Sequence, residues 1–257
     1  MIRGLENLAA MRYPGRGIIL GREPGGRNPV VVYFITGRSP SSQARKLVWE
    51  GETLWTRPTD EATLQKGQVD LLIYPALIMT ETGLAVSNGK QTADIAKSLK
   101  KGSTPGKAAT EGLKAWSFEP DSPIFTPRIS GWLGRDGRGG LHIVKRKTDG
   151  SEERLVHTLP PFKKGRGFLI TTYSGKDRRL VPSFQGGPKK ICLSGALTAK
   201  AQAEAVYRAL EPPRGKKDFR VTVACLVLDL GQNKAKDIHI INRVERMGTD
   251  HGQRKSG

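Results

Sequence analysis

The segment that most constrains the fold is the apolar run at residues 30–35, Val-Val-Val-Tyr-Phe-Ile. A strand with one face in water alternates apolar and polar residues, and this run does not alternate. We therefore expect a strand that is covered on both faces. A second apolar segment, at residues 18–20, precedes it and is separated from it by Pro24-Gly25-Gly26. This spacing predicts an antiparallel hairpin inside a protein of several layers.

Further strands and helices follow from the same patterns. Three segments have helical patterns: residues 91–99, 106–115 and 198–210, the last closed by Pro212-Pro213. Strands are predicted at residues 46–49, 52–56, 70–79, 83–89, 128–133, 141–146, 153–159, 167–173, 190–194, 219–228 and 237–244. Because the helices come in separate places rather than after each strand, the pattern predicts an α+β fold with two packed antiparallel sheets flanked by helices.

The composition is that of a globular, strand-rich protein. The 257 residues are 37% hydrophobic and include 31 Gly and 16 Pro, which is typical of many tight turns. We expect a single domain over residues 12–247, with an extension at 1–11 and a polar tail at 248–257. The chain lacks a signal-peptide core and an apolar run long enough to cross a membrane, so a cytoplasmic protein without membrane contact is expected. Cys192 and Cys225 lie in apolar runs, which favours reduced, buried thiols.

The formal net charge of +19 predicts attraction to anions. Nucleic acid, an anionic membrane surface and a phosphorylated metabolite all satisfy this requirement. Basic clusters occur at residues 145–147, 163–164 and 214–217. Aromatic residues make up only 6% of the chain and do not interleave with these clusters, which argues against nucleic acid. A basic nucleic-acid-binding protein without enzymatic activity is kept as the alternative function.

A loop at residues 117–127 has the features of a site. Pro120, Pro123 and Pro127 restrict the backbone, so the loop should be stiff and non-helical. It carries the carboxylates Glu119 and Asp121, and Arg128 follows directly before an apolar strand. The loop is either a rigid support for an acid and a cation or a surface connection with solvated charges.

Other candidate site residues lie at predicted strand ends. Arg38 and Ser39 follow the apolar strand after a glycine, where a ligand can approach the backbone closely. Tyr74 precedes Pro75, which indicates a bulge or an edge in its strand. Asn88 lies where a strand gives way to a helix. Each of these residues alone is more often structural than functional, and no metal is implied, because no His or Cys has a second ligand at metal-binding spacing.

The stretch at residues 101–108 has a passing likeness to a phosphate-binding P-loop, but it lacks the first glycine, the hydroxyl and the preceding strand.

Six motifs together resemble the archaeal-type IMP cyclohydrolase family and its bacterial relatives. The resemblance spans roughly residues 12–190. The motifs are Tyr13-Pro14-Gly15-Arg16-Gly17; Gly37-Arg38-Ser39; Ile73-Tyr74; Val86-Ser87-Asn88-Gly89; Phe118-Glu119-Pro120-Asp121 through Thr126-Pro127-Arg128-Ile129-Ser130-Gly131; and Thr171-Thr172-Tyr173-Ser174-Gly175 with Pro182-Ser183-Phe184.

The resemblance implies a fold of the N-terminal-nucleophile-hydrolase-like type, a four-layer αββα sandwich. It also implies closure of 5-formamidoimidazole-4-carboxamide ribonucleotide to inosine monophosphate with loss of water, a step of purine biosynthesis that needs no cofactor. The partner is then a small purine ribonucleotide, and a homo-oligomer is left open. The implied site comprises catalytic Tyr74, Asn88, Glu119 and Arg128, with Arg38, Ser39 and, more weakly, Arg16 binding the substrate.

Overall fold

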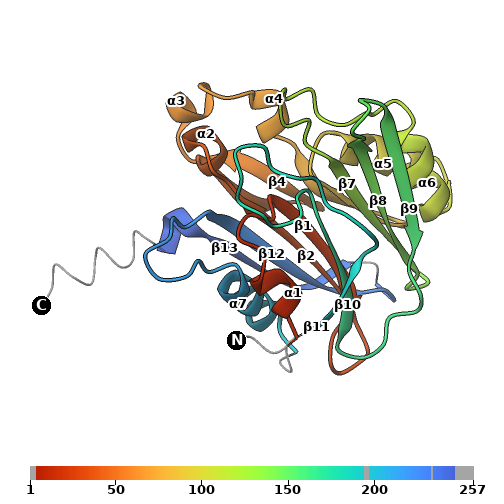
Figure 1. Cartoon of the computed structure of the whole chain (residues 1–257). Helices are drawn as coiled ribbons and strands as arrows, with labels where there is room; N and C mark the ends of the chain where they lie inside the picture. The colour runs from red at the N-terminus through yellow and green to blue at the C-terminus, as the bar shows by residue number, and fades with distance from the viewer. Residues whose placement is uncertain (1–3, 194–196, 233, 247–257) are drawn as a thin grey trace, which may run out of the picture.

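The computed structural model describes residues 4–193, 197–232 and 234–246 and has an α+β fold with two antiparallel sheets (Figure 1). The six-stranded sheet has the order β11 (Lys189–Cys192), β10 (Arg166–Thr171), β1 (Arg16–Arg22), β2 (Pro29–Thr36), β12 (Arg220–Asp229), β13 (Lys234–Asn242). The seven-stranded sheet has the order β3 (Arg45–Glu50), β4 (Thr53–Pro58), β5 (Pro75–Thr80), β6 (Gly83–Ser87), β7 (Arg128–Gly134), β8 (Gly139–Arg146), β9 (Glu152–Thr158).

Helices cover the outer face of each sheet. α7 (Ala199–Ala209) packs on β12 and β13, with α1 (Glu6–Ala9) beside it. On the other sheet, α5 (Gln91–Lys100) and α6 (Pro105–Leu113) pack against β5–β8. Three short helices, α2 (Pro40–Gln43), α3 (Glu61–Leu64) and α4 (Val69–Leu72), lie together near one end of the sheets (Figure 1). Among the described helices, none is long and apolar enough to cross a membrane.

The central strand β2 confirms the prediction from its apolar run. Val31, Tyr33 and Ile35 face the core between the two sheets, while Val32 and Phe34 face the core under α7. All of its side chains are buried. Burying a side chain of this size is worth about 1.5–3 kcal/mol, so a strand with two apolar faces is stable only in the middle of several layers.

The prediction of one strand over residues 70–79 is wrong in its first half. Residues 69–72 form the short helix α4, and β5 begins only at Pro75. A register shift between Leu54 and Trp55 of β4 stands opposite this start, which favours the bulge over the edge, the two alternatives predicted here. Because Pro75 has no N–H, it suits the first position of a strand.

Residues 4–11 of the predicted extension pack onto the domain, since Leu5 and Leu8 are buried against the six-stranded sheet and its helix. The predicted tail at 248–257 lies outside the described residues.

The strand ends that carry the predicted site residues meet at one end of the molecule. β1 and β7 begin there, whereas β2, β6 and β10 end there. Segments far apart in the sequence therefore bring their polar residues together.

Candidate active site

A cleft of about 240 Å³ opens at this end, between the first residues of β1, the end of β2 and the proline-containing loop. Its walls include Arg16, Arg38, Ser39 and Glu119, four of the seven predicted site residues. Leu71 and Leu72 of α4 also line the cleft. The apolar residues for which a strand was wrongly predicted therefore form part of its wall. The other three predicted site residues, Tyr74, Asn88 and Arg128, are buried and do not line the cleft.

Glu119 is the central carboxylate of the cleft. Its side chain is almost fully buried, and its Oε1 accepts hydrogen bonds from Arg16 Nη2 and from Asn88 Nδ2, the latter at 3.2 Å. Within the described residues, Oε2 accepts no hydrogen bond, and it is therefore available to a molecule in the cleft. Burial raises the pKa of Glu119, and Arg16 offsets only part of this rise. A buried carboxyl with a raised pKa can both accept and return a proton near neutral pH.

The stiff loop holds Glu119 through its own hydrogen bonds. The Glu119 N–H donates to the carbonyl of Thr126 at 2.9 Å. Asp121 accepts from the Thr126 N–H at 2.6 Å and from the Thr126 hydroxyl. The second carboxylate of the loop thus closes the loop, and the first faces the cleft.

Arg16 supplies a buried cation next to Glu119. It is the first residue of β1, and its guanidinium pairs with the carboxylate across 103 positions of sequence. Its Nε is buried and has no hydrogen-bond partner among the described residues. An unpaired charged donor is costly to bury, so this N–H points to an acceptor that a ligand supplies.

Asn88 uses all of its hydrogen-bonding capacity to hold the site together. Its Nδ2 donates to Glu119 and to the Pro127 carbonyl at 2.9 Å. Its Oδ1 accepts from the Ile129 N–H at 2.8 Å and from Gln91 Nε2 at 3.1 Å. An amide side chain offers two donors and two acceptor positions, and here all four are occupied. These contacts favour a positioning role for Asn88 over direct contact with a substrate.

Arg128 is held by a backbone carbonyl, an amide side chain and an aromatic ring. Its Nε donates to the Ser117 carbonyl at 2.7 Å, and its Nη1 donates to Gln91 Oε1 at 3.1 Å. The guanidinium lies over the Trp116 ring, 4.6 Å from its centroid. Burial lowers the pKa of Arg128 from its ordinary value, and Glu119 acts in the opposite direction. The cation is therefore fixed in place by a planar fork and an aromatic face.

Tyr74 has a partner that the sequence reasoning missed. Its hydroxyl lies 2.9 Å from the hydroxyl of Tyr33, and both side chains are buried. Tyr33 stands in the apolar strand β2 of the opposite sheet. The only signal in the sequence was a single hydroxyl inside an otherwise apolar run, which ordinary core packing also explains.

Arg38 lies at the rim of the cleft and is partly exposed. Its Nη1 donates to the Arg178 carbonyl at 2.6 Å and pairs with Asp177 at 3.3 Å. Its guanidinium carbon is 4.8 Å from the Tyr13 ring centroid. Ser39, the neighbouring residue, accepts a hydrogen bond from the Ser42 N–H and caps α2.

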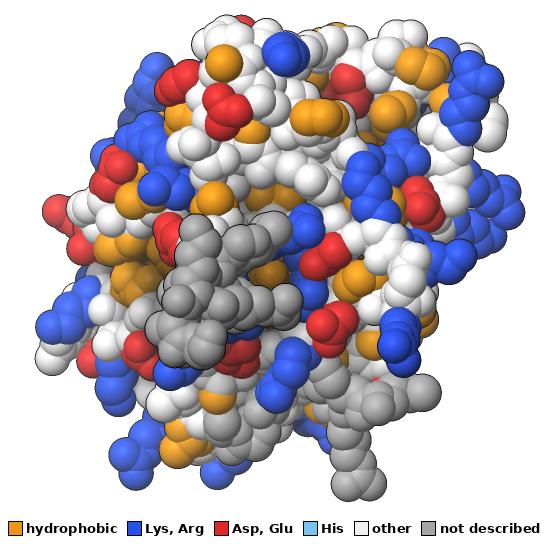
Figure 2. Space-filling view, turned by 90° about the vertical axis from the view of Figure 1, so that its left-hand side faces the viewer, with side chains coloured by type: hydrophobic (Ala, Val, Ile, Leu, Met, Phe, Trp, Pro, Cys, Tyr) orange, Lys and Arg blue, Asp and Glu red, His pale blue; other side chains and the backbone are white. Residues whose placement is uncertain are grey.

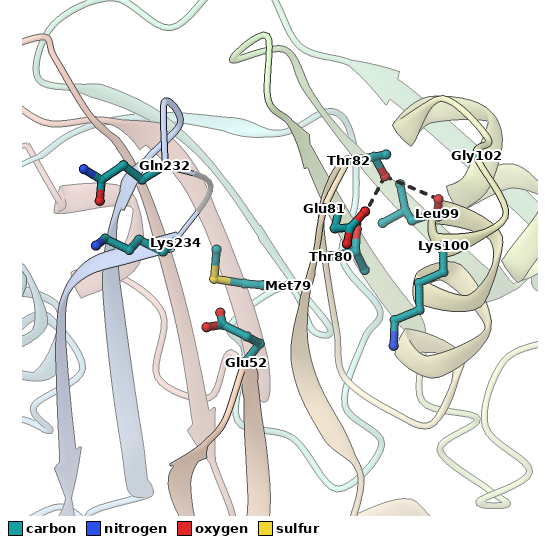
Figure 3. Close-up of a pocket in the computed structure, with 10 residues that line it drawn as sticks. All are labelled: Glu52, Met79, Thr80, Glu81, Thr82, Leu99, Lys100, Gly102, Gln232 and Lys234. Carbon is teal, nitrogen blue, oxygen red and sulfur yellow. Dashed lines mark hydrogen bonds between the residues drawn. The ribbon is translucent and has the colours of Figure 1, made fainter.

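A larger hollow, of about 850 Å³, lies at the opposite end of the sheets between α5, the β5–β6 turn and the β12–β13 hairpin (Figure 3). Glu52, Glu81, Lys100 and Lys234 line it, and all four are exposed. The buried Thr80 in its wall donates to the Gly83 carbonyl at 2.8 Å. Solvated charges of both signs do not provide the buried, partly unpaired groups that the cleft has. Within the described residues, no group of three His, Cys, Asp or Glu side chains is placed to hold a metal ion.

Comparison with known proteins identifies the family. The model of the family described as IMP cyclohydrolase-like protein matches residues 13–226. The chain belongs to the IMP cyclohydrolase-like family. The match includes all seven predicted site residues and extends beyond residue 190, where the resemblance from motifs ended. The IMP cyclohydrolase of Methanopyrus kandleri is 29% identical over 168 residues, which cover 63% of this chain and 75% of the relative.

Proposed function

We propose that the chain is an IMP cyclohydrolase, which closes 5-formamidoimidazole-4-carboxamide ribonucleotide to inosine monophosphate with loss of water, the last step of purine synthesis. Membership of the family and the name of the archaeal relative support this activity. The helix layers outside two packed sheets support an αββα sandwich of the N-terminal-nucleophile-hydrolase-like type.

The observation that carries the proposal is the buried Glu119, with one oxygen available to the cleft, next to the unpaired Nε of Arg16. In the ring closure, the carboxamide nitrogen loses a proton as it attacks the formyl carbon, and the formyl oxygen takes one up. The formamide nitrogen then loses its proton, and the same oxygen leaves as water after taking up a second. Two protons leave nitrogen and two arrive on oxygen, so a group with a raised pKa can serve throughout.

The positions of the side chains suggest a division of roles. Glu119 takes the proton from the carboxamide nitrogen, and Tyr74 donates one to the formyl oxygen. Tyr74 then takes the proton of the formamide nitrogen and Glu119 gives its proton to the leaving hydroxyl, so both groups return to their starting states. Arg16 stabilises the negative charge that develops on this oxygen, because it lies at the cleft wall with an unused donor. Arg128 adds positive electrostatic potential at Glu119 without lining the cleft. Asn88 holds the Glu119 side chain in place through its hydrogen bond. Arg38 at the rim binds the 5'-phosphate, with Ser39 beside it.

The structure offers little support for the alternative, a nucleic-acid-binding protein. Lys145 of the first basic cluster is buried and bonds to Glu153 at 3.1 Å and to the Phe184 carbonyl at 3.2 Å. Lys217 of the third donates to the Arg38 carbonyl at 3.2 Å. On the face shown in Figure 2, the Lys and Arg side chains are spread over the surface and interspersed with Asp and Glu.

The decisive experiment is to incubate the purified protein with the formamido ribonucleotide and to follow inosine monophosphate by chromatography, with and without a metal chelator. We expect conversion in both samples. Absence of conversion in both would refute the activity, and loss of conversion only in chelator, restored by a divalent metal, would refute the cofactor-free reaction. A salt titration of binding to duplex and single-stranded DNA tests the alternative, because nucleic-acid binding weakens steeply with salt.

A further inference from the structure

The Tyr33–Tyr74 pair joins the two sheets at the end where the cleft lies. Tyr33 belongs to β2 of the six-stranded sheet, and Tyr74 immediately precedes β5 of the seven-stranded sheet. The two hydroxyl oxygens are 2.9 Å apart, and the exposed fractions of the two residues are 0% and 1%. Neither hydroxyl has a second hydrogen-bond partner among the described residues.

The pair contains one more donor than it uses. Two hydroxyls bring two O–H hydrogens, and a single hydrogen bond between them uses one. The other hydrogen needs an acceptor, since leaving a buried donor unpaired costs about 1–3 kcal/mol. Neither tyrosine lines the cleft, but both interact electrostatically with Arg16, which does line it. A molecule that binds against Arg16 and reaches past it would supply the missing acceptor.

The direction of the hydrogen bond decides which tyrosine has the unused hydrogen. Burial, and after it the neighbouring Tyr74, raise the pKa of Tyr33 well above its ordinary value. Tyr33 therefore remains a neutral donor over the range in which an enzyme works. A hydroxyl that donates to Tyr74 Oη leaves the Tyr74 hydrogen free, and it also stabilises Tyr74 when that hydrogen is given away.

We propose that Tyr33 is a positioning residue that donates its hydrogen bond to Tyr74 Oη and so directs the Tyr74 O–H toward the substrate oxygen that leaves as water. This role rests on the proposed ring closure and deepens it. Tyr33 does not touch the substrate and acts only through Tyr74. The tight contact between the sheets fixes the Tyr74 hydroxyl in one direction, which a hydroxyl in solvent does not have.

The test compares Tyr33→Phe, Tyr74→Phe and the double variant, with Tyr207→Phe as the control for removing the hydroxyl of another buried tyrosine. We expect Tyr33→Phe to lower kcat about 10- to 100-fold with KM changed less than about threefold. The double variant should be no slower than Tyr74→Phe. Normal kcat with reduced melting temperature in Tyr33→Phe, or additive losses in the double variant, would overturn the proposal.

A second measurement does not depend on turnover. The chain has five tyrosines, so NMR of isotope-labelled tyrosine ring carbons gives five signals that single Phe variants assign. In Tyr33→Phe, the Tyr74 signal should shift, because its hydroxyl loses the hydrogen-bond partner. An unchanged Tyr74 signal would overturn the role of Tyr33 even if the wild-type protein proves inactive on the formamido ribonucleotide. A shifted signal in an inactive protein would support the hydrogen bond and refute only the proposed ring closure.

Discussion

Replacing Glu119 by Gln should affect both catalysis and stability, for separate reasons. The substitution keeps the shape of the side chain and an oxygen that can accept from Arg16 and Asn88. It removes the negative charge and the basic oxygen that faces the cleft. Removing general base catalysis lowers kcat by about 10²-fold or more, which corresponds to about 2.7 kcal/mol in the activation barrier.

The stability effect follows from the burial of the ion pair. The side chains of Arg16 and Glu119 are 10% and 3% exposed, so removing the carboxylate leaves a buried guanidinium without its counter-charge. Breaking such a pair typically costs about 3–5 kcal/mol, and we expect the lower end because the amide still accepts hydrogen bonds. For a chain of this length, about 3 kcal/mol lowers Tm by about 6–12 °C.

The assay combines steady-state kinetics with thermal unfolding of the same preparations. Glu23→Gln is the matched control, since Glu23 is also buried but pairs with neutral Asn28 at the far end of β1. It should lower Tm modestly and leave kcat unchanged. The double variant Arg16→Met, Glu119→Gln should regain stability over Glu119→Gln, because no charge remains buried, without regaining kcat. A kcat for Glu119→Gln within about threefold of wild type would refute the assignment of Glu119.

Three further variants test the surroundings of the site. Arg38→Ala should raise KM about 10- to 150-fold with little change in kcat, because a charged contact to phosphate is worth about 1.5–3 kcal/mol. The control Asp177→Asn should change KM less than about fivefold. A fall in kcat alone in Arg38→Ala would refute a phosphate role. Arg128→Lys should lower kcat about 10²-fold, because lysine has no planar fork for the Ser117 carbonyl and Gln91; normal kcat with lower Tm would limit Arg128 to a structural role. Burial lowers the pKa of His142 from 6.5 to about 4, so the folded state resists protonation of this imidazole. The stability that the neutral His142 contributes is therefore present above pH 6.5 and lost as pH falls toward 4. Urea unfolding measures the free energy of unfolding at each pH, and its fall from pH 6.5 to about 4 should be smaller in His142→Gln than in wild type by up to about 3 kcal/mol. An identical pH dependence in the variant would exclude His142 as the source of the fall.

Local patterns in the sequence determined the layers of the fold and the places where a site could form. The unbroken apolar run of β2 predicted a strand between two cores, because burial on both faces leaves no position for a polar residue. Three prolines predicted a stiff loop around Glu119, and the strand-to-helix junction at Asn88 was recognised from turn and helix signals. These features depend on backbone restrictions and on burial, which act over a few residues.

Only the tertiary structure decided which of these groups act together. Arg16 and Glu119 are 103 positions apart, and Tyr33 and Tyr74 are 41 apart in different sheets. No local pattern relates such pairs, because the packing of one sheet on the other brings them into contact. Residues 69–72, apolar enough for a strand, form a helix beside the cleft. The two carboxylates of the loop also differ in role: Asp121 bonds to Thr126 and closes the loop, whereas Glu119 is a buried acid with a raised pKa. The pKa and role of a carboxylate depend on its solvent exposure and its partners, and its position in the sequence gives neither.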